Sequence, residues 1–127
     1  MKNSEMKDLI ARYLIAYNSF DIEGMLELLS QDVRFENYSG DQLTVTTHSI
    51  TEFKQLAEQS KSLFSEHEQR MTNLDFVGDS AEVTIAYRGK LAMDIPDGPQ
   101  AGTLLKLQGK SEFSFHSGKI TKIVDRS

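Results

Sequence analysis

Three tyrosines interrupt faces that are otherwise apolar, and their hydroxyl groups could orient a small molecule. Tyr13 and Tyr17 lie on the apolar stripe of a predicted N-terminal helix, and Tyr87 lies on the apolar face of a later strand. A phenol hydroxyl can hold a polar group of a ligand, or it can find a nearby partner inside an aromatic core. Both interpretations stay open for each tyrosine.

Asn37 is a polar residue on an apolar strand face. It alternates with Val33 and Phe35 in a short predicted strand. A buried amide without hydrogen bonds costs about 1–3 kcal/mol, so Asn37 needs partners. It either faces a ligand beside Tyr13, or it is tied to the backbone of the turn that ends the strand.

The three histidines do not have the spacing of a metal site. His67 stands between Glu66 and Glu68, and strand alternation directs it to the face opposite both. His48 precedes a helix, His116 flanks a turn, and neither HxH nor HxxxE spacing occurs. Cysteine is absent, as are the glycine-rich nucleotide motifs and the serine-hydrolase motif. We therefore expect no metal and no other cofactor.

Length and charge limit the possible partners. The 127 residues include 14 Lys and Arg against 19 Asp and Glu, which gives a net charge of -5. Nucleic-acid binding needs clustered positive charge, and a membrane-spanning helix needs about 20 apolar residues. The sequence has neither feature, and its first residues lack the apolar segment of a secretory signal. We expect one domain over residues 1–127, located in the cytoplasm, that binds neither nucleic acid nor membrane.

Helical periodicity dominates the first half of the chain. Asp21 is a suitable N-cap for the second helix, and Ser49 with Glu52 forms a capping box before the third. A turn containing Gly40 joins two short β-branched runs between these helices. The predicted elements are helices over 6–17, 22–29 and 50–64 and a hairpin of strands over 33–38 and 43–47.

From about residue 66 onward the apolar period changes to two, which predicts four antiparallel strands. On the second of these strands, Tyr87, Leu91 and Met93 are expected to share the inward face. Strands this long exceed the usual five or six residues, so the sheet should bend strongly. Turn signals separate the strands at 78–79, 96–99 and 117–118.

The order helix, helix, hairpin, helix, long meander resembles the nuclear transport factor 2-like superfamily, which includes the ketosteroid isomerases and the SnoaL-like polyketide cyclases. The resemblance is carried by residues 12–24 and 32–37 and by Gly118-Lys119-Ile120. It implies an α+β, cystatin-like cone: a bent, mostly antiparallel six-stranded sheet wrapped around three helices of the N-terminal half. It also implies a pocket at the wide mouth of the cone and a homodimer.

The resemblance assigns roles to four residues. Tyr13 matches the tyrosine that donates a hydrogen bond to the developing enolate in the isomerases. Ser111 stands where they carry a protonated acid, and Asn37 stands where they carry the general base. Since an amide cannot exchange a proton near neutral pH, ketosteroid-isomerase chemistry is not expected. Asp125, on the last strand, is the expected acid or base if the chain is an enzyme; the alternative is a carboxylate near a frayed C-terminus.

Two functions remain open. The first is a SnoaL-like pocket for a small hydrophobic molecule, which the protein binds, with or without isomerising, cyclising or hydrating it. Its candidate catalytic residues are Tyr13, Asn37 and Asp125. Its expected pocket lining is Tyr17, Phe35, Phe53, Leu56, Tyr87, Leu105, Ser111 and Phe113.

The second function is a non-enzymatic, dimeric protein-interaction module of the same fold. Such a module would fill its cavity with its own side chains and carry an apolar patch on the outer sheet face. The residues expected on that face are polar, which argues against a large hydrophobic docking surface. They are Glu82, Thr84, Arg88, Lys90, Lys106, Gln108, Lys110 and Glu112.

Overall fold

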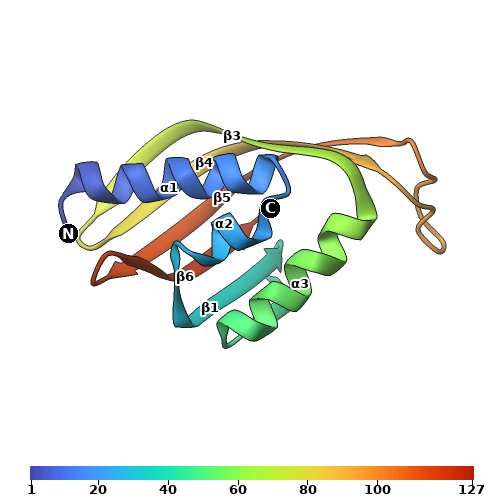
Figure 1. Ribbon diagram of the computed structural model, residues 1–127. Helices are drawn as coiled ribbons and strands as arrows, with labels where there is room; N and C mark the ends of the chain where they lie inside the picture. The colour runs from blue at the N-terminus through green and yellow to red at the C-terminus, as the bar shows by residue number, and fades with distance from the viewer.

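Three helices lie against one face of a bent six-stranded sheet in the computed structural model, which describes all 127 residues (Figure 1). The elements are α1 (Asn3–Asn18), α2 (Ile22–Leu26), β1 (Leu29–Ser39), β2 (Gln42–Thr47), α3 (Ile50–Leu63), β3 (Phe64–Val77), β4 (Ser80–Leu91), β5 (Leu104–His116) and β6 (Lys119–Arg126). This arrangement confirms the predicted α+β fold. None of the helices has the length and apolar character needed to cross a membrane.

The strand order is β2-β1-β6-β5-β4-β3, which places the first strand, β1, beside the last strand, β6, inside the sheet. β1 and β6 pair in parallel, and every other neighbouring pair is antiparallel. Asn37 on β1 lies opposite Asp125 on β6, and Asp125 lies opposite Ser111 on β5. Residues paired in this way point to the same face, so three polar side chains form one row on the helix-covered side.

The hydrophobic core lies between α1 and the middle strands. Met6 and Ile10 on α1 are fully buried, as expected for a stripe with helical spacing. Tyr13 continues this stripe and meets the ring of Phe113 edge-on, with a centroid distance of 5.7 Å. Tyr17, one turn further on, is only partly buried, because the helix there reaches the open end of the sheet.

The N-caps predicted for α2 and α3 are present, but the capping box predicted for α3 is incomplete, because the Glu52 carboxylate accepts from the His48 amide at 2.7 Å and not from that of Ser49. Asp21 accepts a hydrogen bond from the Gly24 amide at 3.0 Å. Ser49 accepts one from the Glu52 amide at 3.2 Å. Caps of this kind satisfy backbone donors that have no partner within the helix.

Two boundaries differ from the sequence prediction. Periodicity predicted that the second helix continues to residue 29, but α2 ends at Leu26 and β1 begins at Leu29. Leu29 belongs to β1 because it pairs with Ile120 of the parallel strand β6. β4 ends at Leu91, so Met93 is not on an inward strand face; it is 51% exposed. Met93 belongs to the β4–β5 connection, which extends beyond the helices (Figure 1).

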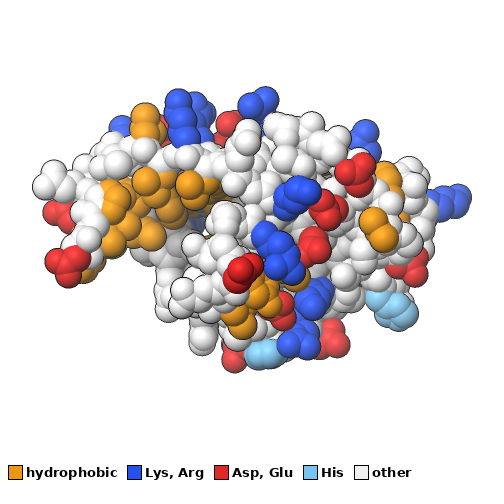
Figure 2. All heavy atoms as spheres, turned by 180° about the vertical axis from the view of Figure 1, so that it is seen from behind, with side chains coloured by type: hydrophobic (Ala, Val, Ile, Leu, Met, Phe, Trp, Pro, Cys, Tyr) orange, Lys and Arg blue, Asp and Glu red, His pale blue; other side chains and the backbone are white.

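The outer face of the sheet is mainly charged. Figure 2, which views the molecule from behind, shows positive and negative side chains interspersed over this face. Lys110 pairs with Glu82, and Arg126 pairs with Glu112, each at 2.9 Å. Hydrophobic side chains gather in Figure 2 at the end that carries the β4–β5 connection.

Candidate functional site

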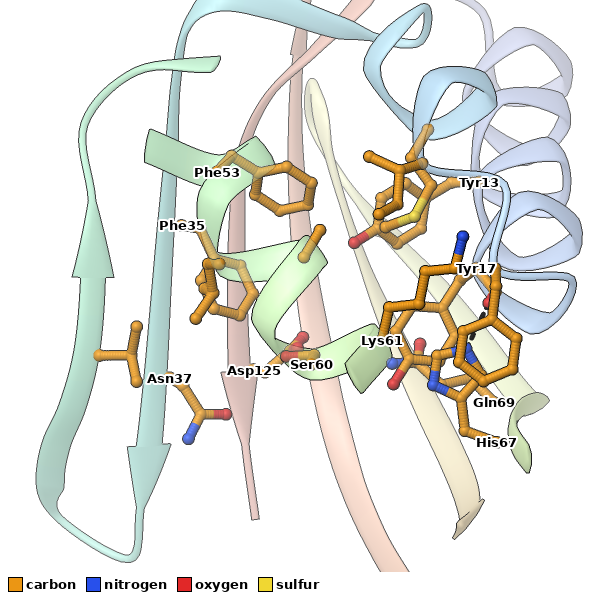
Figure 3. A pocket seen from close by; sticks show the side chains of 16 residues that line it. Tyr13, Tyr17, Phe35, Asn37, Phe53, Ser60, Lys61, His67, Gln69 and Asp125 are labelled. Atoms are coloured by element: carbon orange, nitrogen blue, oxygen red, sulfur yellow. Dashed lines mark hydrogen bonds between the residues drawn. The ribbon is translucent and has the colours of Figure 1, made fainter. Parts of the chain in front are cut away.

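The open end of the cone contains a cavity of about 220 Å³ (Figure 3). Ten of its sixteen lining residues are hydrophobic, which makes it suitable for an apolar molecule. The hydrophobic lining is Tyr13, Tyr17, Phe20, Ile22, Met25, Phe35, Val45, Phe53, Leu56 and Ala57. The polar lining is Asn37, Ser60, Lys61, His67, Gln69 and Asp125.

The structure brings most of the residues proposed from the sequence to this cavity. All three candidate catalytic residues line it, together with four of the proposed pocket residues. The seven are Tyr13, Asn37, Asp125, Tyr17, Phe35, Phe53 and Leu56. They come from α1, β1, α3 and β6, which the fold gathers around one end of the sheet.

Four proposed pocket residues lie elsewhere. Tyr87 and Ser111 line a neighbouring hollow of about 200 Å³, which shares Asp125 with the main cavity. Phe113 is buried in the core against Tyr13 and lines neither space. Leu105 lies far along β5, opposite Gly89, and lines neither space. Strand alternation predicts which face a residue is on, but not how far along the strand the cavity extends.

Asp125 is held in the sheet, not on a frayed end. Its backbone lies between Asn37 and Ser111, and the Ser111 hydroxyl donates a hydrogen bond to Oδ1 at 2.6 Å. Burial raises the pKa of Asp125 to about 6, although the Ser111 hydrogen bond acts in the opposite direction. A carboxyl group with such a pKa changes charge close to neutral pH, as a group that exchanges protons must.

Asn37 lines the cavity while its amide is fixed by the hairpin. Nδ2 donates to the Thr44 hydroxyl at 2.8 Å, and this hydroxyl donates to the backbone carbonyl oxygen of Asn37 at 3.1 Å. The partner of the amide is therefore a side chain of β2 and not the backbone of the turn, which was the alternative expected from the sequence. The two bonds hold the orientation of an amide that borders both hollows.

The two α1 tyrosines stay protonated. Burial raises the pKa of Tyr13 well above its usual value, and the nearby Asp125 carboxylate raises it further. Burial also raises the pKa of Tyr17, with a further contribution from Tyr87. Both hydroxyls are therefore hydrogen-bond donors, and that of Tyr13 lies near the Asp125 carboxyl group.

Several residues of the lining, most notably His67, were not predicted from the sequence. Its ring stacks between Tyr17 and Phe20, with centroid distances of 4.0 and 3.9 Å. Gln69 is two residues further on the same strand face, and its backbone N–H and carbonyl exchange hydrogen bonds with the Asn18 side chain at the end of α1. Alternation already directed His67 away from its glutamate neighbours, and that signal could have identified it as a cavity residue.

The sequence of residues 10–123 matches the model of the SnoaL-like domain, and the chain belongs to this family. The predicted resemblance is confirmed. No curated protein matches the chain in sequence.

Solved structures share the fold at low sequence identity. A candidate polyketide cyclase from Xanthomonas campestris pv. campestris has a TM-score of 0.83 and 19% identity, over 98% of this chain and 90% of that one. IdmH from Streptomyces antibioticus, also a candidate polyketide cyclase, has a TM-score of 0.78 and 18% identity, over 94% and 88%. TerC, crystallised with polyporic acid, has a TM-score of 0.76 and 17% identity, over 95% and 89%.

Proposed function

We propose that this protein holds a small hydrophobic molecule in the 220 Å³ cavity and moves a proton on it with Asp125. The observation that carries the proposal is the position of Asp125, a carboxyl group with a raised pKa at the edge of an apolar cavity. The ligand found with TerC and the polyketide cyclases among the structural relatives support a cyclic organic ligand. Because the cavity is not filled by side chains, the pocket function is favoured over the interaction module.

The proposed chemistry begins with removal of a proton. Above its pKa, Asp125 accepts a proton from a carbon next to a carbonyl group of the ligand, and the electron pair of the C–H bond moves onto the carbonyl oxygen. Tyr13 donates a hydrogen bond to that developing oxyanion. The protonated Asp125 then returns the proton at another carbon, which isomerises the ligand, or to an oxygen after the carbanion has closed a ring. The steroid-isomerase arrangement itself is absent, since Asn37 and Ser111 carry no carboxyl group.

Blocking the cavity should abolish ligand binding. We expect 2-tetralone, a two-ring ketone, to shift the NMR signals of cavity residues in the unmodified protein. Ala57→Trp places a large ring into the cavity and should weaken this binding at least about tenfold, as expected when an apolar contact of over 1.4 kcal/mol is lost. Glu58→Trp is the matched control, because Glu58 is exposed on the same helix and does not line the cavity. Equal binding by Ala57→Trp and the unmodified protein would contradict the proposal, as would the absence of shifts with ketone in large excess.

We also propose that the protein is a homodimer. Leu104, on the outer face of β5, and Met93, in the β4–β5 connection, are both more than half exposed, and a second copy would cover them. The family resemblance points to the same assembly. Sedimentation at high micromolar concentration should give about twice the chain mass of 14.3 kDa. A species of 14.3 kDa under these conditions would refute the dimer.

A further inference from the structure

Lys61 is the one cationic side chain among the residues that line the main cavity at neutral pH. Burial lowers the pKa of His67, the other basic residue of the lining, so the His67 ring is neutral at pH 7.5. The remaining lining residue that can carry a charge is Asp125. A cavity with mainly apolar walls therefore combines one positive group with one ionisable acid.

The lysine ends the stripe of α3 that faces the cavity. With helical spacing, this stripe runs through Phe53, Leu56, Ala57, Ser60 and Lys61. A helix that only packs against a core carries apolar residues at such positions. The helix dipole favours a lysine in the last turn of a helix, but it does so on any face of the helix. The dipole therefore does not explain why this lysine faces the cavity.

No acidic group of the protein neutralises Lys61. None of the ion pairs in the structure includes it, although Glu58 precedes it by one turn on the same helix. Lys54, also on α3, does have a partner, because it pairs with Glu23 at 3.3 Å. The ammonium group of Lys61 is therefore available to a molecule in the cavity.

Lys61 and Asp125 occupy different parts of the site. Lys61 is exposed, whereas Asp125 lies within the sheet and is bonded to Ser111. Figure 3 shows the Lys61 side chain extending from the end of α3 toward α1, with Asn37 on the opposite side of the cavity. A ligand that reaches Asp125 with its reacting carbon can thus present a second group to Lys61 at the mouth.

We propose that Lys61 binds an anionic group of the ligand, such as a carboxylate, which makes the ligand of this cavity an apolar molecule with an acid group at its solvent-facing end. This inference rests on the proposed ligand-binding function of the cavity and names the class of ligand. The apolar part fills the cavity and meets Asp125 with the carbon that loses its proton. A lysine suits the mouth, because its ammonium group donates up to three hydrogen bonds while its stem can lie along apolar surface.

Two probes that differ in one charge test the inference. 2-Naphthylacetate and 2-naphthylacetamide share a ring system and have nearly the same size, but only the first is an anion at pH 7.5. At low salt the unmodified protein should bind the anion about three- to fivefold more tightly, the effect of a partly exposed ion pair, and added salt should reduce this preference. NMR titration gives both dissociation constants. The ¹³Cε signal of Lys61, assigned by its loss in Lys61→Met, should move much more with the anion than with the amide.

Variants on α3 separate a local contact from the overall charge of the protein. Lys61→Met removes the charge and keeps an unbranched side chain, so the preference for the anion should disappear while the amide still binds. Lys61→Arg restores a cation and should retain the preference. Lys54→Met is the matched control, because it removes the same charge from the same helix at a position that does not line the cavity. It should leave the preference unchanged.

Three results would overturn the inference and leave the cavity intact. They are equal affinity of the unmodified protein for both probes, a preference that survives in Lys61→Met, and a preference that Lys54→Met removes to the same extent. The uncharged 2-tetralone separates such a failure from that of the proposed function, because its binding does not depend on Lys61. If neither 2-tetralone nor either naphthalene probe binds, the proposed ligand cavity fails together with the inference.

Discussion

Asp125→Asn should slow proton exchange on a bound ketone by about 10²- to 10⁴-fold, the usual contribution of a positioned base. The unmodified protein is expected to accelerate exchange of the C1 protons of 2-tetralone with D₂O, followed by proton NMR. Asparagine has nearly the same size as aspartate and can still accept the hydrogen bond from Ser111, but it cannot take up a proton. The change therefore removes the base and keeps the shape of the site.

The exchange rate should also depend on pH, in a direction that the ionisation of Asp125 determines. Asp125 acts as a base only when it is ionised, and burial raises its pKa to about 6. The exchange rate should therefore rise as the pH increases from 5 to 7 and then level off. Asp75→Asn, which removes an exposed carboxylate on β3, should leave both the rate and the pH profile unchanged. Exchange by Asp125→Asn at the rate of the unmodified protein would show that another group is the base.

Phe113→Ala should lower the free energy of unfolding by about 3–5 kcal/mol. Phe113 is 1% exposed at the centre of the core, where its ring packs on Tyr13 and Phe115. Removing it takes apolar area out of the core and leaves a cavity that the rigid sheet cannot close. Urea unfolding followed by circular dichroism measures the loss.

A residue on the same strand serves as the control for Phe113. Leu107 is 53% exposed near the far end of β5, so Leu107→Ala should change the free energy of unfolding by no more than about 0.5 kcal/mol. A loss for Leu107→Ala comparable to that for Phe113→Ala would contradict the exposed position of Leu107. A loss below about 1 kcal/mol for Phe113→Ala would contradict its central place in the core.

Local signals predicted most of the fold. Ser49 and Glu52 marked the start of α3, and alternation marked the long strands, because capping and burial act on neighbouring residues. The extent of β1 could not be found in this way. Leu29 fits a helical stripe in the sequence, and only its pairing with Ile120, about ninety residues away, makes it part of a strand.

The site was predictable where periodicity alone decides orientation. Tyr13 and Asn37 were placed on inward faces by their spacing, and both line the cavity. Phe113 shares the inward orientation but lies in the packed part of the core, since periodicity carries no information about depth. Phe20 lines the cavity through its left-handed backbone, a conformation for which a phenylalanine gives no sequence signal.

The charge of the Asp125 carboxyl group tests the central claim most directly. ¹³C NMR of aspartate-labelled protein, with the signal assigned by its loss in Asp125→Asn, gives the titration of this one group. If Asp125 is the proton-transfer group of a ligand cavity, its titration has a midpoint near pH 6 in the free protein. Both this midpoint and the chemical shift of the carboxyl carbon then change when 2-tetralone is added. A midpoint near the ordinary value of 3.8, unaffected by the ketone, would contradict the account.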